Sequence, residues 1–216
     1  MRLNSYRVRR TAGLMAAAAL LLCAGSPEAQ DNLIADPGFD DPSLASWPPG
    51  YVVQATWEWD PLDRGGSPIS GSGRFENMYV GTTFTVTAEQ CVNGLVGGLA
   101  FDAGVHMFFR TGQAATGYGW VQLVFYAGAD CAGAHVVTLS TPHVTQESPG
   151  VWHLSGLSLP AAPDGTASVL FTISNHKGST GGSLVIHFDD AFVFLGGLFS
   201  DGFESGDTSA WSSTVP

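Results

Sequence analysis

Apolar and polar residues alternate with a period of two along much of the chain between residues 30 and 196. In ASVLFTIS (167–174), apolar side chains alternate with serine and threonine, which predicts a strand with one face against a core. In WVQLVFY (120–126), the face opposite the apolar set carries aromatic and polar side chains together. The predicted inward sets are Val169, Phe171 and Ile173 in the first segment and Val121, Leu123 and Phe125 in the second.

Further runs of β-branched and aromatic residues are bounded by Gly, Pro, Asn and Asp, and no segment has the period of an amphipathic helix. Strands at this spacing, joined by short loops, predict an all-β fold, an antiparallel β-sandwich. The predicted strands are 51–59, 74–80, 82–87, 98–110, 118–128, 134–140, 151–159, 166–174 and 183–195.

The first residues read as a secretory signal peptide. Four arginines precede an apolar run, and small residues follow it, with Ala29 one of several acceptable cleavage points. Lipidation of Cys23 is disfavoured, because Leu22 stands where a small residue is needed. The sequence therefore predicts a signal peptide at 1–29, one domain at 30–196, and export to the periplasm, the cell surface or the medium.

Removing residues 1–29 changes the charge. Four of the eight basic residues leave with one of the nineteen acidic ones, so the remainder has a net charge of −14. Nucleic acids and anionic membranes attract clustered Lys and Arg, so neither is an expected partner. No other run has the length of a membrane-spanning helix. We expect the protein to be a monomer.

Two cysteines, Cys91 and Cys131, remain after processing. In an oxidising compartment an isolated pair forms a disulfide, the alternative being two buried free thiols. Two cysteines are too few ligands for a structural zinc site.

No catalytic motif stands out. The six histidines show no HExxH spacing, and there is no GxSxG elbow or glycine-rich phosphate loop. A pair such as Glu76 and Asp102 is the starting point for a polysaccharide-degrading enzyme, the least favoured alternative. A second alternative is a structural or adhesive surface protein without sugar specificity.

Two stretches resemble a known family. NLIADPGFDDPSLASW (32–47) is similar to the N-terminal signature of jelly-roll carbohydrate-binding modules of the CenC-like group (families 4, 9 and 22), and GGSLVIHFDDAFVFL (181–195) resembles their last strand. The resemblance implies a jelly roll of the galactose-binding-like kind and a secreted, non-catalytic protein that binds a glycan or polysaccharide. The chain departs from the family pattern at Asp40 and Ala191.

The resemblance also implies a structural Ca²⁺. The acid after Gly-Phe and the first Asp of the terminal pair would be ligands, which are Asp40 and Asp189, with the carbonyl of Gly38 as a third donor. Hard carboxylate oxygens suit this ion. The alternative is that these acids stabilise turns and satisfy buried backbone groups.

A sugar site needs flat aromatic rings beside hydrogen-bonding side chains. The alternative for each aromatic residue is core packing, to which we assign Trp47 and Trp152. The candidate ligand-binding residues are Trp120, Gln122, Tyr126, Trp57, Trp59, Tyr79, Arg74 and Asn77.

The last segment, 197–216, repeats part of the opening line. Phe203 and Trp211 have the same spacing as Phe39 and Trp47, and each Phe is preceded by Gly and followed by an acid. The segment is too short to bury a core of its own. We expect a flexible C-terminal tail, with a surface tag as one use for it.

Overall fold

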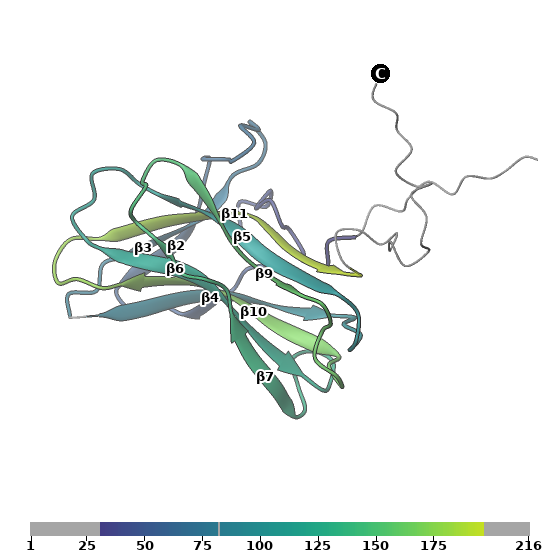
Figure 1. Ribbon diagram of the computed structural model, residues 1–216. Helices are drawn as coiled ribbons and strands as arrows, with labels where there is room; N and C mark the ends of the chain where they lie inside the picture. The colour runs from purple at the N-terminus through teal and green to yellow at the C-terminus, as the bar shows by residue number, and fades with distance from the viewer. Residues whose placement is uncertain (1–30, 82, 197–216) are drawn as a thin grey trace, which may run out of the picture.

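The computed structural model describes residues 31–81 and 83–196, which form two antiparallel sheets packed face to face (Figure 1). This part of the chain contains no helix, and so none that would span a membrane. The all-β sandwich prediction is confirmed. The predictions of a signal peptide at 1–29 and a tail at 197–216 concern residues outside the described ones.

Sheet A has the order β1-β4-β10-β6-β7, with β8 also paired to β6. Sheet B has the order β2-β3-β11-β5-β9. The strands of sheet A are β1 (Pro49–Tyr51), β4 (Phe84–Asn93), β10 (Ser168–Lys177), β6 (Gly117–Tyr126), β7 (His135–Ser140) and β8 (Val144–Thr145). Those of sheet B are β2 (Ala55–Asp60), β3 (Ser72–Asn77), β11 (Leu184–Leu195), β5 (Phe101–Phe109) and β9 (Trp152–Leu159).

The predicted strand 51–59 is wrong in one respect, because the structure divides it between the two sheets. β1 ends at Tyr51 and pairs with β4, whereas β2 begins at Ala55 and pairs with β3. Between them Gln54 has a φ of 50°, in the left-handed region that an extended strand does not contain. The segment therefore crosses from one sheet to the other, a turn that its β-branched residues did not reveal.

The core lies between the sheets and follows the period-two pattern. All six predicted inward residues of β6 and β10 are fully buried. Trp47 is fully buried as predicted, but Trp152 is only half-buried and lies on β9 with its ring 5.4 Å from that of Phe108. The assignment of Trp152 to the core is therefore wrong.

The N-terminal segment 32–47 runs along the last strand. The Asn32 side chain bonds the backbone of Ala191 and Val193, and the Ala191 N–H donates to the carbonyl of Pro37 at 2.9 Å. The expected proximity of the two ends of the sandwich is confirmed. These hydrogen bonds to the backbone of β11 hold the segment that contains Gly38, Phe39 and Asp40 beside that strand.

Three tryptophans secure this segment through their indole N–H groups. Trp47 donates to the carbonyl of Asp36 at 3.0 Å, Trp57 to that of Trp47 at 2.8 Å, and Trp59 to that of Phe39 at 2.8 Å. The ring of Phe39 stacks on Trp47 with centroids 5.1 Å apart. Residues 36–47, here called the plug, are thus held by three indoles. Each indole packs against the plug and donates to one of its carbonyls.

A glycine on β3 makes room for this plug. A Cβ at Gly73 would lie 2.1 Å from a ring atom of Trp57 and 2.7 Å from one of Phe39. Any side chain there would displace both rings.

The predicted disulfide is confirmed. Cys91 on β4 bonds Cys131 in the loop after β6, across 40 residues of sequence. The bond links β4 to the loop that follows β6, although β10 lies between β4 and β6 in the sheet. It therefore ties the β6–β7 loop across sheet A.

We predict that the double variant Cys91→Ala, Cys131→Ala loses about 4 kcal/mol of unfolding free energy, since the crosslink limits the unfolded chain. Urea unfolding of the purified domain measures this loss, with oxidised wild type as reference. Wild type treated with reductant should match the variant. Equal stability of the oxidised and reduced forms would contradict the prediction.

Candidate functional site

The outer face of sheet A carries four rings in contact, here called the aromatic cluster: Tyr118, Trp120, His143 and His176. Tyr118 stacks on His143 with centroids 4.3 Å apart and on His176 at 4.5 Å, so it lies between two imidazoles. Trp120 lies 5.4 Å from Tyr118 and 5.2 Å from His143. All but the exposed His143 are half-buried, so the rings are partly accessible, with Tyr118 covered on both faces by imidazoles and Trp120 tilted by 41° against Tyr118.

Strand register places polar side chains beside these rings. On β10, Ser174 pairs with Trp120 and Thr172 with Gln122, while the facing residues of β4 are Thr87 and Glu89. Side chains two residues apart share a face of a strand, so this row of hydroxyl, amide and carboxylate groups continues the ring surface. Flat rings beside such groups are the requirements of a sugar site.

His176 is held neutral at this site. Burial, followed by the nearby charge of His143, lowers the pKa of His176 below its ordinary value. Its Nδ1 lies 2.8 Å from the Thr85 hydroxyl, which fixes the ring. At neutral pH this imidazole therefore offers a stacking surface and a hydrogen-bonding edge, and no charge.

Trp120 and Gln122 lie on this face as predicted, and Tyr126 lies on the same side of β6 further along, beside His135. Tyr118 was missed, although its spacing from Trp120 was a sufficient signal. His143 and His176 come from a loop and from another strand, so only strand pairing brings them here.

Trp57 and Trp59 are not part of this surface. Trp57 faces the core from sheet B, with its ring centroid 4.2 Å from that of Phe75, and both indole N–H groups are bonded to the N-terminal segment. The structure therefore favours the packing alternative for both.

The remaining predicted residues are engaged elsewhere. Asn77 is fully buried, and its amide donates to the carbonyls of Phe84 and Asn175. The ring of Tyr79 stacks on Phe84 at 4.3 Å, and Arg74 forms ion pairs with two glutamates on sheet B. The expectation that Asn77 contacts a ligand is corrected, because no amide hydrogen faces the surface, and Arg74 lies on the opposite sheet from Trp120.

The pair considered for catalysis is far apart. Glu76 pairs with Val185 and Asp102 with Phe194, nine residues further along β11. At the rise of a strand this is roughly 25–30 Å, well beyond the separation at which two carboxylates flank one glycosidic bond.

Oxygen donors gather where calcium is expected. The Ser70 hydroxyl lies 3.1 Å from the Gly38 carbonyl and 2.8 Å from Asp63 Oδ2, and a Cβ at Gly38 would lie 3.6 Å from Asp40 Oδ1. Burial, with the negative charges of Asp190 and Asp63, raises the pKa of Asp189 to about 7.

This donor set suits calcium chemically, although its oxygens also serve the protein. Asp189 accepts N–H groups from Arg64 and Asp190, and Asp36 accepts the N–H of Asp40 at 2.6 Å. Within 31–81 and 83–196, no group of three or more His, Cys, Asp or Glu side chains is arranged to hold a metal ion. Each carboxylate oxygen nevertheless keeps a second lone pair for a cation.

No protein-family model matches the sequence, and the search of curated proteins finds no match. Solved structures do match. The carbohydrate-binding module TmCBM61, in complex with β-1,4-galactotriose, has a TM-score of 0.50 and 16% identity, over 76% of this chain and 99% of that one. A carbohydrate-binding module from the β-sandwich superfamily has a TM-score of 0.51 and 15% identity, over 78% and 64%.

The fold is that of carbohydrate-binding modules. The same fold occurs in the enzymatically active domain of tailspike protein 4 from bacteriophage CBA120, with a TM-score of 0.57 and 14% identity over 76% of this chain. This chain spans 21% of that domain. At these identities the likeness concerns the fold.

On the outer side of sheet B, the buried residue His187 gives stability a dependence on pH. Burial lowers its pKa to about 4, the positive charges of Arg74 and Arg110 act in the same direction, and Asp60 opposes them. Its Nδ1 lies 3.1 Å from the Ser72 hydroxyl. Because the unfolded chain takes up a proton at a higher pH than the folded one, stability is lost as the pH falls from about 6.5 to about 4.

We predict that wild type loses about 2 kcal/mol more unfolding free energy than His187→Gln when the pH falls from about 7 to about 5. Urea denaturation at the two pH values measures the difference. His135→Gln, at an exposed position, should keep the wild-type slope. An unchanged slope in His187→Gln would contradict the prediction.

Proposed function

We propose that this chain is a secreted, non-catalytic glycan-binding module whose ligand lies on the aromatic cluster of sheet A. The observation that carries the proposal is the contact of Tyr118 with Trp120, His143 and His176 on one outer face. Sugar rings present apolar C–H faces that stack on such rings, and their hydroxyls bond to neighbouring polar groups. The half-buried Gln122, Thr87 and Glu89 supply those groups here, whereas Ser174 and Thr172 between them are buried.

The fold supports this function without fixing the sugar. TmCBM61, which has this fold, binds β-1,4-galactotriose. An exposed run of rings along one strand and its neighbours suits an extended glycan better than a small molecule held in a closed pocket.

The non-catalytic part of the proposal rests on the carboxylates. Glu76 and Asp102 pair with residues at opposite ends of β11. Glu89, beside the aromatic cluster, pairs with Thr172 and has no second carboxylate opposite it on β10. A structural surface protein remains the second candidate, favoured only if the aromatic cluster binds no glycan.

We predict that Trp120→Ala weakens glycan binding at least about tenfold while leaving the fold intact, since one stacking ring is lost from a surface position. Affinity electrophoresis through gels containing soluble polysaccharides identifies the glycan and measures the loss. The matched control is Trp152→Ala, which removes a half-buried ring from sheet B and should keep wild-type retardation.

Three outcomes would count against the proposal. Retardation that survives Trp120→Ala would move the ligand off the aromatic cluster. An absence of retardation by any polysaccharide would favour the structural protein. Release of reducing ends from the retarding polysaccharide would show an enzyme.

We also propose that Ca²⁺ binds between the N-terminal segment and β11, through Asp40, Asp189 and the carbonyl of Gly38, with Asp63 as a further donor. These oxygens are the hard ligands that Ca²⁺ prefers. A cation there would offset the burial, and with it the charge repulsion, that raise the pKa of Asp189. The ion would tie the plug to the last strand.

We predict that the melting temperature falls when EDTA removes the metal and recovers with added Ca²⁺, because an ion bound only by the folded state stabilises it. The gain from Ca²⁺ should grow with pH up to about 7, since protons compete for Asp189 below its pKa. Asp189→Asn should abolish the calcium response, and Asp164→Asn, at an exposed loop position, should retain it. Indifference of wild type to EDTA and Ca²⁺ would show that the site is absent.

A further inference from the structure

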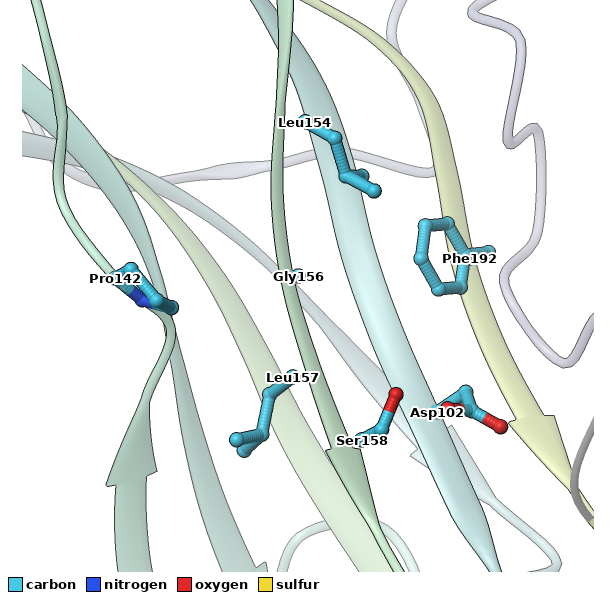
Figure 2. Close-up of a pocket in the computed structure, with 7 residues that line it drawn as sticks. All are labelled: Asp102, Pro142, Leu154, Gly156, Leu157, Ser158 and Phe192. Atoms are coloured by element: carbon cyan, nitrogen blue, oxygen red, sulfur yellow. The ribbon is translucent and has the colours of Figure 1, made fainter.

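The outer face of sheet B contains a groove of about 290 Å³, on the opposite side of the sandwich from the aromatic cluster. Figure 2 shows the lining residues, with Phe192 of β11 and Leu154 of β9 near one end, Asp102 and Ser158 at the other end, and Leu157 with Pro142 on the other side of β9. This volume is at the small end of ligand sites, which suits a single sugar-sized group.

One glycine, Gly156 of β9, lines the groove, and its partner Gly104 lies under the ring of Phe192. Gly104 on β5 pairs with Gly156 on β9 and, on its other side, with Phe192. A Cβ at Gly104 would lie 2.8 Å from the ring of Phe192, so that ring lies over bare backbone. The missing side chain of Gly156 leaves a recess beside this aromatic wall.

An unpaired carboxylate closes the end of the recess. Asp102 is only 7% exposed, yet no residue in the described part of the chain donates a hydrogen bond or an ion pair to it. The Ser158 hydroxyl lies across the strand pair and points toward the same end of the groove (Figure 2). Neither carboxylate oxygen of Asp102 is a buried atom without a partner, so both are reached from the groove and are available to the donors of a ligand.

The basic side chains of the described residues do not neutralise Asp102. Arg64 pairs with Asp190, Arg74 with two glutamates, and Lys177 donates to the Tyr79 carbonyl at 2.5 Å. Arg110 lies beyond the other end of β5, nearer Glu76. The basic side chains engaged in these contacts therefore do not compete with a ligand for Asp102.

We propose that this groove binds a protonated amino sugar, such as a glucosamine residue of a longer glycan. Its ammonium group meets Asp102, a ring hydroxyl meets Ser158, and an apolar ring face lies against Phe192. An ammonium is preferred over a neutral hydroxyl because charge-assisted hydrogen bonds are about twice as strong as neutral ones. The site shares no residue with the aromatic cluster, so it stands or falls separately from the proposed function.

The test is calorimetric titration of the secreted protein with the tetramer of glucosamine at about pH 6, where the amino group is protonated. Cellotetraose and the N-acetylated tetramer serve as neutral comparisons. Wild type should prefer the glucosamine tetramer. Asp102→Asn, which keeps the shape and removes the charge, should weaken its binding about 10- to 100-fold.

Two variants separate this site from its alternatives. Gly156→Ala adds a methyl group to the floor at ordinary contact distances, 3.5 Å from Leu154 Cγ and from the Ala103 carbonyl, so the protein should fold and lose binding. Asp164→Asn removes the same charge from an exposed loop and should bind as wild type does, which excludes a general attraction of cations to an acidic protein. Trp120→Ala should also bind as wild type does.

The proposal is overturned if Asp102→Asn and Gly156→Ala keep wild-type affinity for the glucosamine tetramer, or if wild type does not bind it. Equal binding of cellotetraose would overturn the ammonium assignment. A loss confined to Trp120→Ala would place the amino sugar on sheet A instead.

Discussion

The structure depends on three indole hydrogen bonds that hold the N-terminal segment against the sandwich. Trp47, Trp57 and Trp59 each donate to a carbonyl of residues 36–47, and Phe39 packs among them. Without these donors, buried carbonyls would lose their partners, each at a cost of about 1–3 kcal/mol. The same plug sets Pro37 beside β11, where its carbonyl accepts the N–H of Ala191 at 2.9 Å.

The two outer faces of the sandwich have different chemistry. Sheet A presents stacked rings beside neutral polar side chains, and one carboxylate, that of Glu89, lies next to them. Sheet B presents the ion pairs of Arg74 and the buried His187, and then, toward β9, a recess floored with glycine. Under the two binding proposals, these faces would take two dissimilar parts of one glycan, or two separate glycans.

Buried charge is concentrated along β11. His187 and Asp189 both face outward and both are nearly inaccessible, but burial moves their pKa values in opposite directions. The histidine favours folding at higher pH, and the aspartate in the absence of a cation favours it at lower pH. Between about pH 4 and pH 7, their effects on the free energy of unfolding have opposite signs. The pH dependence of stability therefore reflects both side chains together.

The sequence by itself determined the sandwich, because the period-two pattern decides which side chains of β6 and β10 meet the core. It also predicted the disulfide, because Cys91 and Cys131 are the two cysteines left once the predicted signal peptide is set aside, and the structure decided between a bond and two free thiols. It also placed Trp120 and Gln122 on an outer face. Only the tertiary structure decided that Trp57 and Trp59 secure a plug, since a strand pattern does not say which face an aromatic residue covers. The same holds for His143 and His176, and for Asp102 beside Gly156, because pairing between distant strands brings these residues together.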